Sequence, residues 1–217
     1  QGGDGNDTLA GDDGNDVFFG GNGNDTLQGG AGTDYLLGEQ GVDSLDGGEG
    51  DDVYFYASGE GNDHISDSGG TDWLVFSDIY WGQVQLGVGS MKLTIPGGEI
   101  HLDDFDADNP YAAVGIEYFQ FADGTVMSKA QLINTIGFTP TGTPEADVLS
   151  GTALADTIRA LAGDDVVTAR GGNDTVYADD GADVVSAGEG NDIVYGGMGD
   201  DVLLGEAGRD TLAGGIG

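Results

Sequence analysis

A nine-residue period dominates this chain. Nonapeptides such as GGDGNDTLA and GDDGNDVFF follow one another without a gap over residues 2–55, and two more cover 58–75 after a two-residue interruption. Eight further copies cover 142–213, so sixteen copies account for 144 of the 217 residues. A fixed short period predicts a repeat architecture in which each unit packs mainly on its neighbours.

Three positions of the nonapeptide recur through the copies. The sixth residue is always Asp, the fourth is Gly in fourteen of sixteen copies, and the eighth is always apolar. Glycine tolerates positive φ and close backbone approach, so residues one to six predict a turn. Residues seven to nine predict a short strand with one inward side chain. The expected inward residues are Leu9, Phe18, Leu27, Leu36, Leu45, Tyr54, Ile65, Leu74, Leu149, Ile158, Val167, Val176, Val185, Val194, Leu203 and Leu212.

The charge is strongly one-sided. Forty Asp and Glu against five Lys and Arg give a formal net charge of −35, which should repel both nucleic-acid phosphates and anionic lipids. The absence of Cys excludes disulfides and thiolate metal sites, and no apolar run approaches the length of a membrane span. The chain starts and stops inside a repeat, so we expect a segment of a longer protein.

Stacked turns would bring the position-six carboxylates into close, mutually repelling rows. A hard divalent cation with oxygen ligands would neutralise these rows. Calcium suits such turns better than magnesium, because it accepts flexible geometry and many carboxylate and carbonyl oxygens. The composition therefore points to a calcium-dependent fold.

The pattern GGxGxDxUx, with U apolar, resembles the RTX (repeats-in-toxin, haemolysin-type) Ca²⁺-binding nonapeptides over about two thirds of the chain. The resemblance implies an all-β parallel β-roll in two blocks. Two nonapeptides make one right-handed coil, and roughly 8–12 Ca²⁺ ions lie between successive turns of one edge.

The same resemblance implies the ligands. The aspartates would bridge neighbouring ions, and turn carbonyls would complete each shell. The implied carboxylate ligands are Asp7, Asp16, Asp25, Asp34, Asp43, Asp52, Asp63, Asp72, Asp156, Asp165, Asp174, Asp183, Asp192, Asp201 and Asp210. The implied turn glycines are Gly3, Gly5, Gly14, Gly21, Gly23, Gly30, Gly32, Gly41, Gly48, Gly50, Gly163, Gly172, Gly181, Gly188, Gly190, Gly197, Gly199 and Gly208.

The second block departs from the pattern at its start. Glu145 and Leu154 replace the position-four glycine, so we expect the first two repeats to form a capping coil with little or no metal. Asp147 and Asp156 would then serve mainly as lids for the first ions above them. Leu161 and Arg170 at position two are expected to fit the turn if φ is negative there.

The segment 76–141 lacks the period and is rich in aromatic residues. Alternating apolar residues on either side of Gly89-Ser90 predict a hairpin across 84–95, followed by a turn at Pro96 into a strand at 100–102. A further strand is expected at 114–121. The segment therefore predicts an aromatic-rich β-meander.

A short helix is expected at 128–136, with Ser128 as N-cap and Gln131 in the capping-box position. The stretch GIEYFQFADGT at 115–125 resembles a flanking module often found after RTX blocks. That resemblance implies support for packing and folding, with no chemistry attached.

Other candidate sites are weaker. Asp104, Asp106 and Asp108 have the spacing of an EF-hand loop, but Gly115 stands where the bidentate Glu belongs, so a solvated acidic loop is the favoured interpretation over a metal site. His64 and His101 have no partner at metal-ligand or triad spacing, and no catalytic motif is present. We expect no enzyme activity in this segment.

These observations predict two rolls, 1–75 and 142–217, separated by a flanking module at 76–141. The RTX resemblance implies a Ca²⁺-folded segment of a secreted or surface-exposed bacterial protein, exported by type I secretion machinery through its parent chain. The parent is expected to be an adhesin or surface-layer protein. The alternative is the C-terminal region of a secreted enzyme or toxin, such as a protease, a lipase or a pore-former.

Overall fold

The computed structural model describes residues 1–87 and 91–217. The turn predicted at Gly89-Ser90 lies outside these residues, although the strands on its two sides are present as β10 (Gln85–Gly87) and β11 (Lys92–Ile95). The chain divides into two compact units. One contains residues 1–85 and most of the segment up to Ile136, and the other contains 137–217 together with Leu86, Gly87 and the short segment Asp106–Pro110.

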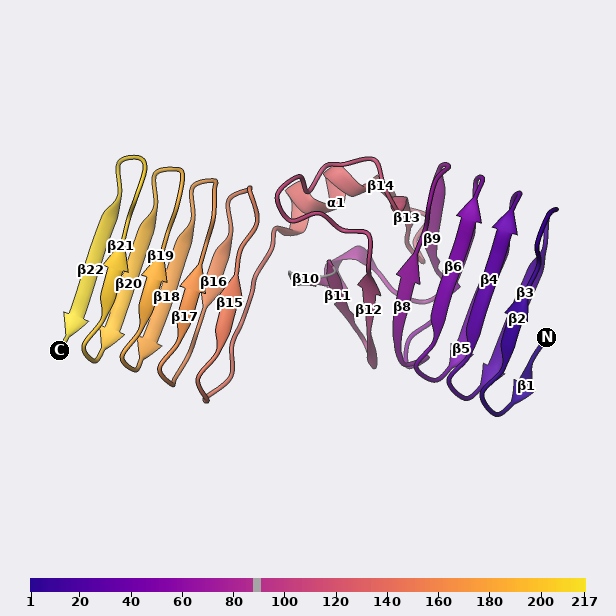
Figure 1. Cartoon of the computed structure of the whole chain (residues 1–217), viewed down its shortest axis with the longest axis horizontal. Helices are drawn as coiled ribbons and strands as arrows, with labels where there is room; N and C mark the ends of the chain where they lie inside the picture. The colour runs from indigo at the N-terminus through magenta and orange to yellow at the C-terminus, as the bar shows by residue number, and fades with distance from the viewer. Residues whose placement is uncertain (88–90) are drawn as a thin grey trace. The chain divides into compact units, whose positions relative to one another are not determined.

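The first unit is built on a parallel β-roll whose strands alternate between two sheets (Figure 1). Its strands are β1 (Gly3–Asp4), β2 (Thr8–Ala10), β3 (Val17–Asn22), β4 (Thr26–Ala31), β5 (Tyr35–Gln40), β6 (Ser44–Glu49), β7 (Val53–Tyr56), β8 (Asn62–Ser66) and β9 (Asp72–Phe76). One sheet has the order β1-β3-β5-β7-β9, and the other contains β8-β6-β4-β2. The predicted all-β roll with two nonapeptides per coil is confirmed.

The register of the first roll follows the repeat. Leu27 pairs with Leu45, eighteen residues later, whereas Tyr54 pairs with Leu74, twenty residues later. The two extra residues, Tyr56 and Ala57, are therefore absorbed within one coil. Several strands are longer than the predicted three residues, because the ladder continues from position nine into positions one to three of the next repeat.

The aromatic-rich segment continues both sheets of the first roll. β12 (Gly98–Leu102) pairs parallel with β8 and antiparallel with β11, which confirms the turn at Pro96. β13 (Ile116–Gln120) pairs parallel with β9, and β14 (Val126–Ser128), which the pattern did not predict, returns antiparallel to it.

The helix lies where the capping signal placed it. α1 spans Lys129–Ile136, the Gln131 N–H donates to Ser128 Oγ at 3.3 Å, and the Ser128 N–H donates to Gln131 Oε1 at 2.9 Å. The capping box is thus formed, and Leu132 and Ile133 supply the buried face of the helix.

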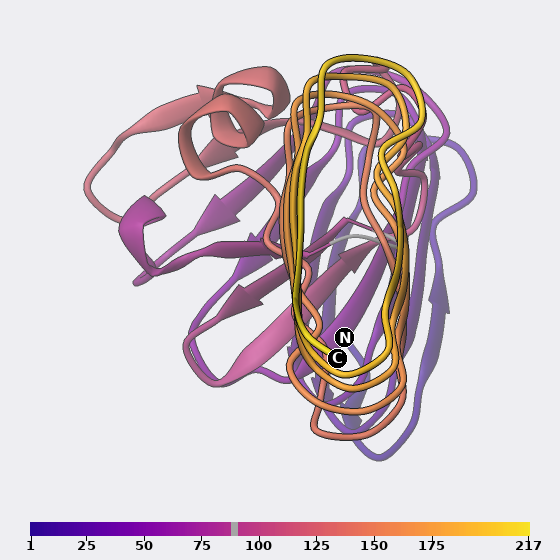
Figure 2. The ribbon, with the colours of Figure 1, turned by 90° about the vertical axis from the view of Figure 1, so that its left-hand side faces the viewer.

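The second unit is a β-roll with the same construction. Its strands are β15 (Val148–Ser150), β16 (Thr157–Arg159), β17 (Val166–Thr168), β18 (Thr175–Asp180), β19 (Val184–Ser186), β20 (Ile193–Met198), β21 (Val202–Leu204) and β22 (Thr211–Ile216). They form two four-stranded parallel sheets, paired eighteen residues apart. Viewed along this roll, its coils superimpose in a narrow, flattened outline (Figure 2).

Three positions of each repeat face the interior of a roll. Position eight supplies the apolar core, as the fully buried Leu27 and Val176 show, while the end residue Leu212 is 43 % exposed. Strand alternation also turns positions six and one inward, so Asp25 and Ala178 are buried as well. The position-six carboxylate and the position-one residue therefore face each other within most turns, although the position-one residue Ser58 is exposed.

Candidate metal sites

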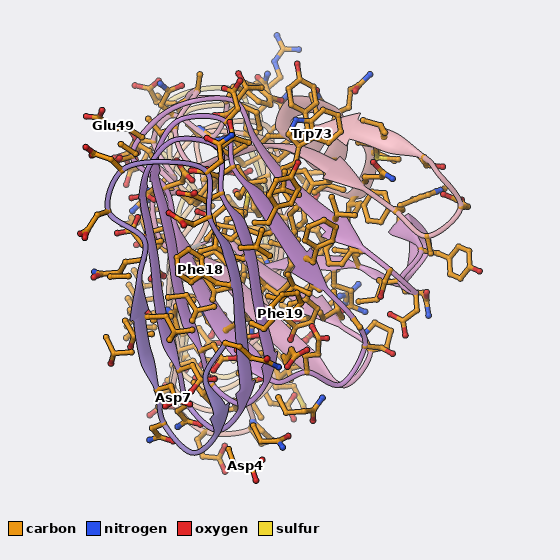
Figure 3. All side chains as sticks on the ribbon, turned by 90° about the vertical axis from the view of Figure 1, so that its right-hand side faces the viewer. Asp4, Asp7, Phe18, Phe19, Glu49 and Trp73 are labelled. Atoms are coloured by element: carbon orange, nitrogen blue, oxygen red, sulfur yellow. The ribbon has the colours of Figure 1, made fainter. Side chains whose placement is uncertain are left out.

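The position-six aspartates form hydrogen-bonded ladders along the roll edges. The backbone N–H of Asp7 donates to Oδ1 of Asp25 at 2.8 Å, and the N–H of Asp174 donates to Oδ1 of Asp192 at the same distance. Figure 3 looks along the first roll, with Asp4 and Asp7 at one end of the flattened coil and Glu49 and Trp73 at the other. One ladder runs along each of these two ends, and two more run along the second roll. The ladders are Asp7-Asp25-Asp43-Asp63, Asp16-Asp34-Asp52-Asp72, Asp147-Asp165-Asp183-Asp201 and Asp156-Asp174-Asp192-Asp210.

The second oxygen of most of these carboxylates is buried and unpaired. Among the described residues, twelve Oδ2 atoms have no hydrogen-bond partner. They belong to Asp7, Asp16, Asp25, Asp34, Asp43, Asp52, Asp72, Asp165, Asp174, Asp183, Asp192 and Asp201. Burying an anionic oxygen without a partner is costly, so these rows fit a bound cation, and their all-oxygen chemistry fits Ca²⁺.

The turn glycines allow consecutive coils to approach closely. At position four, Gly32 has φ +140°, and a Cβ there would lie 2.0 Å from the carbonyl oxygen of Gly14 in the preceding coil. Any side chain would therefore push the turns apart. This close approach brings turn carbonyls beside the carboxylate rows, where they can contribute to a Ca²⁺ shell.

A second side-chain ladder runs along position five, and the repeat pattern did not reveal it. The Asn24 N–H donates to Asn6 Oδ1 at 2.9 Å, and the Asn191 N–H donates to Asn173 Oδ1 at 2.8 Å. The backbone N–H at position five thus donates to the Asn side chain of the neighbouring coil and not to the position-four carbonyl of that coil. This carbonyl is therefore available to a cation. The frequent Asn at position five was the available signal.

In most repeats position two is left-handed, whether or not it is glycine. Leu161 has φ +83° and Arg170 has φ +78°, so the expectation that these residues fit through a negative φ is wrong. Each such residue costs about 1 kcal/mol or more relative to glycine. The Arg170 guanidinium gains an ion pair with Asp108 at 2.8 Å.

Burial raises the pKa of seven of the ladder carboxyls. The pKa of Asp174 is raised to about 7, chiefly by burial and further by the carboxylates of Asp156 and Asp192. The pKa of Asp52 is raised to about 6, again chiefly by burial, with Asp67 and Asp34 adding to the effect. Protons and cations therefore compete for the same oxygens near neutral pH.

In the first coil of the second roll, protein groups donate hydrogen bonds to the Oδ2 atoms that have no partner in the later repeats. Asp156 Oδ2 accepts the N–H of Thr152 at 2.6 Å and its hydroxyl at 3.1 Å. Asp147 Oδ2 accepts the N–H of Thr143 at 2.5 Å and its hydroxyl at 3.0 Å. A threonine at position two thus partners the oxygen that is unpaired in the later repeats, which supports the predicted capping role of this coil.

We expect bound Ca²⁺ to be sparse in the coil 142–159 and continuous along both edges of 160–213. Anomalous scattering from crystals grown with Ca²⁺ would measure this directly. The turn at Gly190 serves as the internal reference for a fully ligated site. Equal anomalous peaks at the Glu145 and Leu154 turns would contradict the capping role.

The flanking segment completes one ladder, although its resemblance implied no chemistry. Glu117 in β13 accepts the N–H of Asp72 at its Oε2, 2.9 Å away. This carboxylate occupies the place that the Asp of a further coil would take. Similarly, the Glu99 N–H in β12 donates to Asn62 Oδ1 at 3.0 Å and extends the position-five ladder.

Pairing of β8 with β12 brings the two histidines together. The rings of His64 and His101 stack at 4.8 Å, and His64 Nδ1 lies 3.1 Å from the carboxylate of Asp103. Sequence spacing could not show this, because the contact depends on a parallel pairing across 37 residues. The stacked rings lie face to face and do not converge on a common point.

The three aspartates with EF-hand spacing take separate partners. Asp104 Oδ2 accepts the N–H of Asp67 at 2.7 Å, and Asp106 Oδ1 accepts the N–H of Asp108 at 2.9 Å. Asp108 in turn pairs with Arg170. These contacts favour a structural acidic loop over a metal site.

Comparison with known families agrees with this geometry. The RTX calcium-binding nonapeptide repeat matches over residues 1–27, 19–54, 55–78, 141–176, 150–185 and 177–212. The haemolysin-type calcium binding protein related domain matches over 91–131. No curated protein matches the chain. Because the repeat matches cover more than half of the sequence and coincide with the two rolls, the chain belongs to the RTX calcium-binding nonapeptide repeat family and binds multiple Ca²⁺ ions.

Proposed function

We propose that this RTX module is unfolded without Ca²⁺ and folds on binding it, as a structural segment of a larger extracellular bacterial protein. The twelve buried, unpaired aspartate oxygens carry this proposal. They line the interior of both rolls, where a bound cation would satisfy them at neutral pH while the chain stays folded. The implied position-six aspartates and turn glycines are the proposed ligands.

The direction of the switch follows from mass action. A cation that binds the folded roll but not the unfolded chain stabilises the fold increasingly, with the logarithm of its concentration, once that concentration exceeds the dissociation constant. Cytosolic Ca²⁺ is scarce, so the acidic chain would stay unfolded and ready for type I export through its parent protein. Calcium outside the cell would then drive folding.

The parent protein is proposed to be an adhesin or a surface-layer protein, with the rolls as rigid spacers. Two rolls, 1–75 and 142–217, around a module at 76–141 suit a long structural parent. The alternative is the tail of a secreted enzyme or toxin. A catalytic motif upstream in the gene would favour the enzyme, and tandem adhesive domains would favour the adhesin.

The described part of the chain contains no helix long and apolar enough to span a membrane. Its single α-helix, α1, has eight residues. The RTX rolls supply a structural, calcium-binding role, and the proposed function assigns them no catalytic step.

Isothermal titration calorimetry with Ca²⁺ and Mg²⁺ tests the proposed sites. We expect several Ca²⁺ ions to bind, on the order of 8–12, while Mg²⁺ substitutes poorly because it prefers a tight octahedral shell and retains its waters. Equal heats and stoichiometries for the two ions would contradict the assignment. Absence of Ca²⁺ binding would refute it altogether.

A further inference from the structure

One turn of the first roll carries an additional inward carboxylate. Position one is glycine or alanine in fourteen of the sixteen repeats, but the last repeat before the flanking segment has Asp67 there. Asp67 is only 4 % exposed. One carboxylate oxygen each from Asp52, Asp67 and Asp72 lies within 4.8 Å of the others.

We propose that Asp52, Asp67 and Asp72 form a three-carboxylate site for a Ca²⁺-like cation, with Asp67 as a ligand that the repeat pattern does not supply. The proposal rests on the proposed Ca²⁺-binding function and adds a stronger site at one turn. Asp52 and Asp72 are 0 % and 1 % exposed, and each has an Oδ2 atom without a hydrogen-bond partner among the described residues. Because these oxygens are buried and unpaired, they point to a bound cation, which acidic side chains grouped at a surface would not.

A glycine opens the space into which these oxygens point. At Gly47, a Cβ would lie 2.5 Å from Asp52 Oδ2 and 2.6 Å from Asp67 Oδ2. Gly47 occupies position one of the preceding coil, directly below Asp67 in the stack. The missing side chain therefore leaves room for carboxylates from two coils to converge.

A buried tyrosine orients the extra carboxylate. Tyr54 takes the place of an aliphatic residue at position eight, and its hydroxyl accepts the N–H of Gly47 at 2.6 Å. The same hydroxyl donates to Asp67 Oδ2 at 2.7 Å or to the Ser66 carbonyl at 2.9 Å. Asp67 Oδ1 accepts the N–H of Gly69 at 3.1 Å. Such outer hydrogen bonds fix a ligand in the orientation that binding requires.

The dimensions and charge suit calcium. Oxygens bound to one Ca²⁺ at 2.3–2.6 Å can be separated by at most about 5 Å, which accommodates the observed cluster. Three buried carboxylates without a cation would repel one another strongly. Because their combined charge exceeds that of a divalent ion, a trivalent lanthanide of similar size should bind this site more tightly than the two-carboxylate sites.

Terbium luminescence in the full 217-residue chain tests the proposal. The Tyr54 ring is placed to sensitise an ion at this site, so the wild-type chain should show a tight luminescent phase. Asp67→Asn, which keeps the side-chain shape, should weaken that phase at least about tenfold and leave the weaker phases unchanged. Asp67→Ala, which restores the alanine found at position one of other repeats, should do the same. Glu49→Gln removes an exposed charge near the same edge and should have no effect.

Two outcomes would refute the three-carboxylate site, and a third would also refute the proposed function. If Asp67→Asn retains the tight phase, Asp67 is not a ligand and the three-carboxylate site is refuted. If terbium anomalous peaks place no ion among the three carboxylates of the wild type, the site is likewise refuted. If the wild-type chain binds neither terbium nor Ca²⁺, the proposed function itself fails.

Discussion

In excess chelator at neutral pH, the chain is expected to lose most of its β-structure, and millimolar Ca²⁺ is expected to restore it cooperatively. Without cations, the folded rolls would hold four rows of carboxylates, and most of these have a buried second oxygen with no donor in the described structure. The unfolded chain hydrates the same groups fully. The free energy of unfolding should therefore be small or negative until Ca²⁺ occupies the rows.

The pKa shifts give this expectation a pH dependence. Burial raises the pKa of Asp174 from 3.8 to about 7 in the calcium-free fold. The folded state then binds more protons than the unfolded state, so the stability of the calcium-free fold decreases as the pH rises from about 4 to about 7. Mildly acidic, calcium-free buffer should accordingly recover part of the β signal that is lost at neutral pH.

Far-UV circular dichroism across a Ca²⁺ titration measures both effects. Magnesium at the same ionic strength is the control for simple charge screening. A chelated sample at neutral pH with the full β signal would refute the folding switch. Full recovery with Mg²⁺ would show that screening, rather than coordination, drives folding.

The sequence predicts the architecture well because one pattern repeats sixteen times. Each apolar residue at position eight, such as Leu36 or Val185, must find the same environment in its own coil, so the period determines both the register and the core. The inward position of the aspartates follows from the same alternation. These features require no knowledge of distant contacts.

Other parts of the sites depend on contacts that the period does not contain. Glu117 completes a ladder only because β13 pairs with β9 across 44–45 residues. The stacking of His64 on His101 likewise depends on a long-range strand pairing. Asp67 departs from the pattern at position one, and its role becomes visible only when Tyr54 and Gly47 are placed beside it.

Replacing one ladder carboxylate in the middle of the second roll should have a large effect on Ca²⁺ binding. Asp174 is 1 % exposed, its Oδ1 accepts the N–H of Asp156 at 2.8 Å, and its Oδ2 has no partner in the described structure. Asp174→Asn can keep the first contact through its amide oxygen but loses the anionic ligand. Since even outer-shell changes at metal sites cost about 10–100-fold in affinity, we expect at least this loss, or about 1.4–2.8 kcal/mol.

Asp180→Asn provides the matched control, because it makes the same chemical change within the same coil. Asp180 lies at position three, where its side chain is exposed, and its backbone φ is not left-handed. The two variants lose the same net charge, so a general effect of charge would shift their Ca²⁺ midpoints equally. If Asp174 is a metal ligand, the Ca²⁺ midpoint should rise for Asp174→Asn and not for Asp180→Asn. Removal of a buried charge also relieves repulsion in the calcium-free roll. Asp174→Asn should therefore need more Ca²⁺ to fold and yet lose less β-structure in chelator. Simple destabilisation of the fold would not produce this combination.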